Sequence, residues 1–241
     1  MKKLITLTLA LSMMAVTNAQ WGKKVRGNGD VVTIERSVGD YDAVSLAGWF
    51  DLEIVAGNEG EITLKGESNL LEYIKTEVKN GKLIVKQERG VNLRPSNWNS
   101  GITVTVPIED INAVSLSGSG DVVSRTTIKA DDFDASMSGS GDVSLTVEAQ
   151  SLNASLSGSG DINLEGSATD FSVQVSGSGD VKAYGLEAEF VTAQVSGSAD
   201  IKVTANQSID ARVSGSGDIS YRGNPKKIKS KASGSGDISK G

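Results

Sequence analysis

The sequence predicts an all-β protein, a parallel β-helix (β-solenoid) with coils of about 19 residues and a small antiparallel excursion near the N-terminus. Three observations lead to this prediction. A short motif recurs at a nearly constant spacing, apolar residues alternate with polar ones around it, and glycine marks each junction between coils.

The recurring motif is Ser-Gly-Ser-Gly-Asp, with one copy that reads Ser-Gly-Ser-Ala-Asp. Successive copies are 21, 19, 19, 20, 18 and 19 residues apart. Self-similarity at a fixed period is typical of repeat proteins, whose short units bury their apolar faces only by stacking. The motif ends at Asp121, Asp142, Asp161, Asp180, Asp200, Asp218 and Asp237.

Apolar residues alternate with polar ones on both sides of each motif. Before Asp180 these are Phe171, Val173 and Val175, and Val181 follows it. A period of two indicates a strand with one buried face, and the abundance of Val and Ile agrees. Each unit is therefore predicted as strand, corner, strand, with equivalent strands stacked in parallel about 4.8 Å apart. A propeller blade would need about 40 residues, twice the available length.

The chemistry of the motif suits a sharp corner. Glycine adopts positive φ without steric cost, and Ser and Asp side chains bond nearby backbone N–H groups. We therefore expect a structural role for the seven aspartates. The alternative is a calcium ladder that stabilises the solenoid. Calcium takes six to eight oxygens, usually from several carboxylates, so one Asp per coil would be a thin site.

The N-terminal residues 1–19 are predicted to be a signal peptide. Lys2 and Lys3 give a positive start, residues 4–16 form an apolar run, and small residues precede a cut before Gln20. Residues 20–241 are then predicted to form a single β-helical domain. We expect an exported protein in the periplasm, on the outer-membrane surface or secreted.

Within this domain, regular repeats are expected over 111–241, and an antiparallel excursion over 58–110 packs on the first coils. Asn80-Gly81 is a strong signal for a two-residue hairpin turn. Residues 69–74 are expected to form one helical turn at most. Residues 101–107 are expected to form a strand that Pro107 ends.

The absence of Cys and His excludes several classes of function. Without Cys, the chain has neither disulfides nor the lipidation site of a lipoprotein. Without His, it lacks the commonest general base and zinc ligand, so we expect no enzyme and no cofactor. The net charge of −6 and the lack of a basic stripe argue against nucleic acid. After signal cleavage no apolar run is long enough for membrane insertion.

The motif ladder resembles the head GIN domain family of auto-transporter adhesins. Residues 41–54, 69–74 and 80–83 also match that family's pattern, so the resemblance covers about residues 35–240. It implies an exported β-helical protein of the kind found in Bacteroidetes-like bacteria, with an adhesin-like role.

We therefore expect a non-catalytic binding or structural module of the bacterial cell envelope or surface, with a protein or glycan partner. The expected ligand contacts are Trp49, Phe50 and Trp98, aromatic residues that interrupt the small, polar pattern. The alternative is that these side chains cover the apolar end of the first coils.

A second hypothesis is a carbohydrate-binding or polysaccharide-acting β-helix, since glycosidases need only two carboxylates. Uniformly short coils, which leave no long loops to wall a cleft, argue against it. Near the C-terminus lie Lys226, Lys227, Lys229, Lys231 and Lys240. We expect these lysines to discourage pairing at an open sheet edge, rather than to bind a membrane or polyanion.

Overall fold

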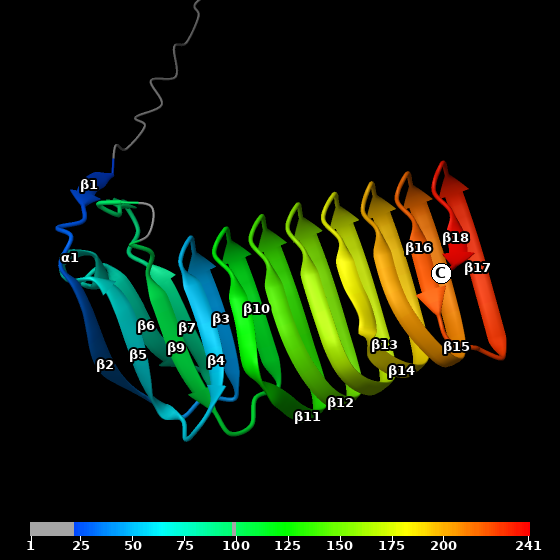
Figure 1. The fold of residues 1–241 in the computed structure, drawn as a ribbon, viewed down its shortest axis with the longest axis horizontal. Helices are drawn as coiled ribbons and strands as arrows, with labels where there is room; N and C mark the ends of the chain where they lie inside the picture. Colours follow the sequence, from blue (N-terminus) through cyan, green and yellow to red (C-terminus); the bar gives the residue numbers. More distant parts are fainter. Residues whose placement is uncertain (1–21, 98–99) are drawn as a thin grey trace, which may run out of the picture.

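The protein is described by a computed structural model covering residues 22–97 and 100–241, so the predicted signal peptide lies outside the described residues. The predicted β-solenoid is confirmed: stacked coils of parallel strands make up most of the length of the molecule (Figure 1). No helix among the described residues is long and apolar enough to cross a membrane.

The strands in chain order are β1 Lys23–Arg26, β2 Val31–Gly39, β3 Ala43–Gly48, β4 Asp51–Ala56, β5 Gly60–Glu67, β6 Ile74–Lys79, β7 Lys82–Gln87, β8 Val91–Arg94, β9 Thr103–Ile108, β10 Ala113–Gly118, β11 Val122–Gly139, β12 Val143–Gly158, β13 Ile162–Gly177, β14 Val181–Gly197, β15 Ile201–Gly215, β16 Ile219–Arg222, β17 Lys227–Gly234 and β18 Ile238–Lys240. One helical turn, α1 Ser68–Leu71, lies between β5 and β6.

Each of the strands β11 to β15 bends midway and so supplies two arms to its coil. The first arm follows the corner aspartate, and the second arm precedes the next Ser-Gly corner. Neighbouring coils pair in parallel, so equivalent residues stack on one another. One column of the second arm consists of Phe133, Leu152, Phe171, Val191 and Ile209.

Both arms point alternate side chains into one apolar core. In β12 the first arm buries Val143, Leu145 and Val147, and the second arm buries residues 152, 154 and 156. The polar side chains between the buried positions of the second arm, such as Asn153, are exposed. The alternation in the sequence thus corresponds to inward and outward faces of the coils.

The corner glycines allow the coils to approach closely. Gly158 has φ of 145°, and a Cβ at this position would lie 2.1 Å from the carbonyl oxygen of Gly139 in the preceding coil. The second glycine of the same motif, Gly160, would place a Cβ 1.8 Å from the carbonyl oxygen of Gly141. Both distances are steric overlaps. The first glycine is present in every copy of the motif, so it serves the contact between coils as well as the turn, whereas the second position is alanine, Ala199, in one copy.

Differences in coil length are absorbed away from the Ser-Gly corners. The pairing register shifts between Val123 and Thr127 in the first arm of β11, whereas residues 132–139 pair with β12 without interruption. A bulge admits extra residues without displacing the rest of a strand. The spacing of the aspartates can therefore vary while the corners stay stacked.

The N-terminal excursion is only partly antiparallel, which corrects the prediction for residues 58–110. Strand β5 runs antiparallel to β9, and β6 runs antiparallel to β7. However, β7 and β9 run parallel to β3 and β4, and so form one more coil in front of residues 43–56. The reason is the predicted hairpin turn: Asn80 and Gly81, at φ of 51° and 73°, reverse the chain after β6 and return β7 to the solenoid direction.

Two smaller predictions can also be compared with the structure. The expected single helical turn is α1. Pro107 was expected to end its strand, but β9 continues to Ile108. Proline is tolerated there because β5 pairs with β9 only as far as Thr105, so Pro107 lies where that side of the strand has no partner.

A pair of substitutions in β13 tests the inward and outward assignment. Val175 is fully buried between Leu156 and Val195, and its neighbour Gln174 is exposed. Val175→Asp would bury an unpaired carboxylate and should cost about 3 kcal/mol or more. Gln174→Asp should change stability by no more than about 0.5 kcal/mol.

Thermal unfolding of residues 20–241 measures both variants. Each kcal/mol shifts the midpoint by about 2–4 °C for a chain of this size. A Val175→Asp protein that melts like the parent would show that the inward assignment is wrong.

Candidate functional site

The three aromatic residues predicted to contact a ligand have different locations. Phe50 is 1% exposed and belongs to the core cluster. Trp98 lies outside the described residues. Trp49 is half-buried, and it lines a surface groove.

The orientation of Trp49 is fixed on two sides. Its indole N–H donates to Gln87 Oε1 at 2.7 Å, and Gln87 in turn donates to the carbonyl of Val91. Its ring meets the Phe50 ring edge to face, with centroids 6.3 Å apart and an interplanar angle of 85°. A ring held in this way loses little freedom when a ligand packs on it.

The groove beside Trp49 has a volume of about 660 Å³, within the usual range for small-molecule sites. Strand β8 contributes Leu93 and Arg94, and the segment after β8 contributes Pro95, Ser96 and Gly101. The lining combines one aromatic, two apolar side chains and one guanidinium. This arrangement can pack against an apolar or sugar face and can pair with an anionic or hydroxyl group.

A buried glutamate holds one wall of this groove. Glu67 at the end of β5 is fully buried, and its carboxylate accepts hydrogen bonds from the Ser96 N–H and hydroxyl, each at 2.8 Å, and from the Gly29 N–H at 3.1 Å. Burial alone would raise the pKa of Glu67, but these hydrogen bonds outweigh it, so the pKa lies below the usual value. The sequence analysis missed Glu67, because no local pattern indicates a partner 29 residues away.

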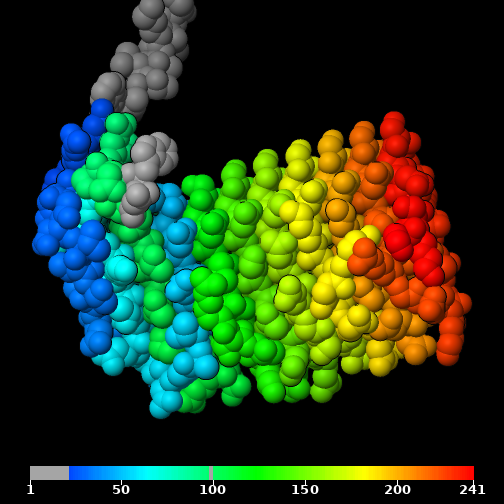
Figure 2. All heavy atoms as spheres, in the orientation of Figure 1, coloured from blue at the N-terminus to red at the C-terminus, as the bar shows by residue number. Residues whose placement is uncertain are grey.

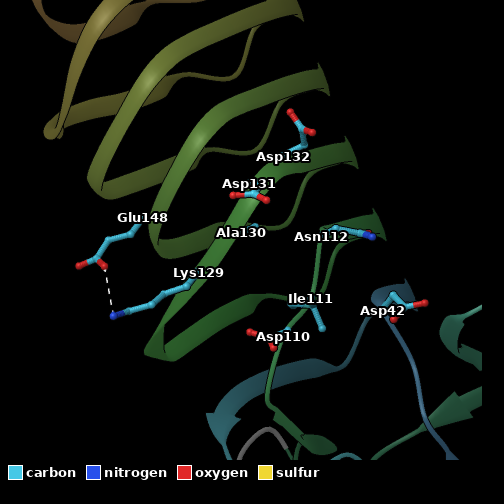
Figure 3. A pocket seen from close by; sticks show the side chains of 9 residues that line it. All are labelled: Asp42, Asp110, Ile111, Asn112, Lys129, Ala130, Asp131, Asp132 and Glu148. Atoms are coloured by element: carbon cyan, nitrogen blue, oxygen red, sulfur yellow. Dashed lines mark ion pairs between the residues drawn. The ribbon is translucent and has the colours of Figure 1, made fainter.

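A second hollow of about 670 Å³ lies near the bend of the first coils and has a largely acidic lining (Figure 3). Its carboxylates are spread along the hollow, and Glu148 is paired with Lys129 at 3.4 Å. Among residues 22–97 and 100–241, no three acidic, His or Cys side chains are grouped so as to hold a metal ion. The other acidic residues of this lining are Asp42, Asp110, Asp131 and Asp132.

The aspartate column has a clear structural role. The backbone N–H of each corner aspartate donates to Oδ1 of the aspartate in the preceding coil, at 2.8–3.1 Å. The column begins at Asp51 and continues to Asp237. These carboxylates complete the hydrogen bonding at the corner, as expected, but they act across coils rather than within one turn.

Two members of the column differ in electrostatics. Burial raises the pKa of Asp51, and the charges of Asp121 and Glu53 add to this effect against the hydrogen bond from the Asp121 N–H. Burial would also raise the pKa of Asp161, but hydrogen bonds from Lys182 Nζ at 2.6 Å and from the Asp180 N–H lower it below its usual value. At the start of the column, burial is therefore the main cause that raises the pKa of Asp51, and in the middle Lys182 helps to lower the pKa of Asp161.

Asp51→Asn and Asp161→Asn should therefore shift stability in opposite directions at neutral pH, since each keeps an oxygen for the N–H of the next coil. A raised folded-state pKa stabilises the fold in acid, and this contribution is lost as the pH rises through that pKa. A lowered folded-state pKa stabilises the fold at neutral pH, and this contribution is lost as the pH falls through that pKa. Asp51→Asn should melt higher and Asp161→Asn lower, each by less than about 1 kcal/mol.

Thermal melts at neutral pH and near pH 3, below the usual Asp pKa, measure this prediction. The difference in melting temperature between each variant and the parent should be smaller near pH 3 than at neutral pH. Shifts of the same sign in both variants at neutral pH would contradict the assigned roles of Lys182 and Asp51.

Calcium should leave the melting temperature unchanged, because the carboxylates of the column from Asp51 to Asp218 already accept a hydrogen bond from the next coil. A ligand at 100 times its Kd adds about 2.7 kcal/mol, which a melt would detect. A rise with Ca²⁺ that EDTA reverses would overturn the structural interpretation of the column.

Comparison with known proteins supports the predicted family. Residues 40–225 match the family described as "Putative auto-transporter adhesin, head GIN domain". The chain is 25% identical to a crystal structure from Bacteroides fragilis described as a "putative adhesin", with a TM-score of 0.83 and coverage of 90% of this chain and 99% of the other. No curated protein matches significantly.

Two further crystal structures come from the genus Parabacteroides. One from P. distasonis, described as a "putative lipid binding protein", is 28% identical, covers 91% of this chain and 100% of its own, and has a TM-score of 0.74. One from P. merdae, described as a "putative adhesin", is 21% identical with a TM-score of 0.72, covers 91% of this chain and 99% of its own, and shows the fold alone. The chain therefore belongs to the head GIN domain family of auto-transporter adhesins.

Proposed function

We propose that this chain is a non-catalytic, adhesin-like surface module that binds a glycan in the groove at Trp49. Membership in an adhesin-head family indicates an exported or surface protein that binds some partner. Export by the predicted signal peptide, absence of a lipid anchor and a non-catalytic role are parts of the proposal.

The observation that carries the proposal is the oriented indole in a groove of ligand size. Elsewhere along the solenoid, the position of Trp49 in the corner is serine, as at Ser119 and Ser140. Figure 2 shows one face of the solenoid, with its coils packed side by side. An aromatic face with a neighbouring guanidinium, here Trp49 and Arg94, suits the apolar face and hydroxyl rim of a sugar.

Trp49→Ala tests the groove. Residues 20–241 would be screened on an array of envelope and host oligosaccharides, and the best binder would be titrated by calorimetry. We expect at least tenfold weaker binding by Trp49→Ala, because the central aromatic of a contact site carries much of its binding energy. Trp49→Phe keeps an aromatic ring and should lose less binding affinity than Trp49→Ala.

Phe190→Ala is the matched control, because Phe190 is an exposed aromatic, 43% accessible, outside the Trp49 groove. It should bind like the parent. Equal binding by the parent and Trp49→Ala, with both folded by their melts, would contradict the proposed site.

A lipid is the second candidate for the same groove. The apolar side chains of Leu93 and Pro95 flank Trp49, and the P. distasonis relative is described as a putative lipid binding protein. A dodecanoate titration in the same calorimeter separates the two candidates. Dodecanoate binding that Trp49→Ala abolishes, without binding to any glycan on the array, would favour the lipid.

A further inference from the structure

The C-terminal end of the solenoid differs in charge from the coils beside it. Residues 113–180 contain ten Asp or Glu and two Lys or Arg, whereas residues 222–241 contain six Lys or Arg and one Asp. This basic segment forms the last coil and lies at one end of the molecule (Figures 1 and 2). The positive charge is therefore concentrated where the stacking of coils stops.

Strand β17 in this coil has one open edge. It pairs with β15 in parallel from Lys227 to Gly234, and no described strand pairs with its other edge. All eight of its residues are exposed. By contrast, the second arms of β11 to β15 each lie between two neighbours. The open edge thus offers an unused row of backbone donors and acceptors.

The two faces of β17 continue the columns of the preceding coil. Ile228 and Ala232 stack on Ile209 and Val213, which are each 2% exposed, but Ile228 itself is 51% exposed. The apolar core columns therefore end without a cover. On the opposite face, Lys229 and Lys231 stack on Asp210 and Arg212, and Lys227 stacks on Ser208.

We propose that the open edge of β17 binds an extended acidic polypeptide segment, which adds one parallel strand to the solenoid. Backbone groups of the segment would pair with the free edge. Its acidic side chains would lie beside Lys227, Lys229 and Lys231, and its apolar side chains would cover Ile228 and Ala232. This is strand addition, in which the main chain supplies affinity and alternate side chains supply specificity.

Charge and hydrogen bonding together select this partner. The three lysines repel the same edge of a second copy, because like charges directly opposite each other destabilise a strand pair. A row of free N–H and C=O groups in strand register is matched by another polypeptide backbone. A glycan or a lipid headgroup could neutralise the lysines but would leave that row unpaired. This inference concerns the opposite end of the molecule from the Trp49 groove and is independent of the proposed function.

The register of β17 specifies a probe. The peptide Glu-Ile-Glu-Ser-Glu-Ala-Ser-Gly repeats the β17 pattern with its lysines replaced by glutamate. Binding of a fluorescent form to residues 20–241 would be followed by anisotropy, and amide shifts would locate it by NMR. We expect saturable binding that weakens with salt, and shifts concentrated in residues 227–234.

Two controls separate strand addition from simple charge attraction. The triple variant Lys227→Gln, Lys229→Gln, Lys231→Gln alters exposed side chains only, should melt like the parent and should bind at least tenfold more weakly. The same peptide with N-methylated backbone amides keeps its charges but cannot pair, so it should not bind. Equal binding by the N-methylated peptide, or by the triple variant, would overturn the proposal.

Two other outcomes would also overturn it. Association with phosphatidylglycerol vesicles, with no binding of the peptide, would assign the basic end to a lipid surface. Dimerisation in sedimentation velocity that the triple variant abolishes, again with no peptide binding, would assign the edge to a second copy of the chain.

Discussion

In-register stacking of the glycine corners is the constraint on which the rest of this structure depends. At Gly158 the backbone of one coil lies so close to the backbone of the preceding one that a side chain would overlap with the carbonyl oxygen of Gly139. Once the corners are fixed, the arms must follow in register, and apolar residues stack on apolar residues. Bulges in the arms then absorb the variation in coil length without disturbing the corners.

The same stacking also creates an electrostatic problem, because an aspartate at every corner is brought beside its equivalents. In the aspartates from Asp51 to Asp218, Oδ1 accepts the N–H of the next coil, so the carboxylate replaces a missing ladder partner. Lys182 pairs with Asp161 and helps to lower its pKa, whereas burial, with the charges of Asp121 and Glu53, raises the pKa of Asp51. The hydrogen bonds of the aspartate column stabilise the stack of coils, whereas the proximity of its negative charges destabilises it.

Chemical variety in this protein lies where the repeat begins and stops. At the N-terminal end, the returning strands β7 and β9 and the segment after β8 meet the first corner, and Trp49 lines the groove that results. At the C-terminal end, β17 has a free edge and uncovered core residues. A regular solenoid offers little concavity along its faces, so its ends are the natural places for recognition.

The sequence by itself determined the coils, because the Asp spacing, the alternation before Asp180 and the Asn80-Gly81 turn are local patterns with local causes. It also marked Trp49 as an interruption of the corner motif. Only the tertiary structure decided that Phe50 is buried, that Glu67 anchors Ser96, and that β7 and β9 form a coil in front of β3 and β4. Each of these depends on contacts between residues far apart in the chain, and such contacts leave no periodic trace in the sequence.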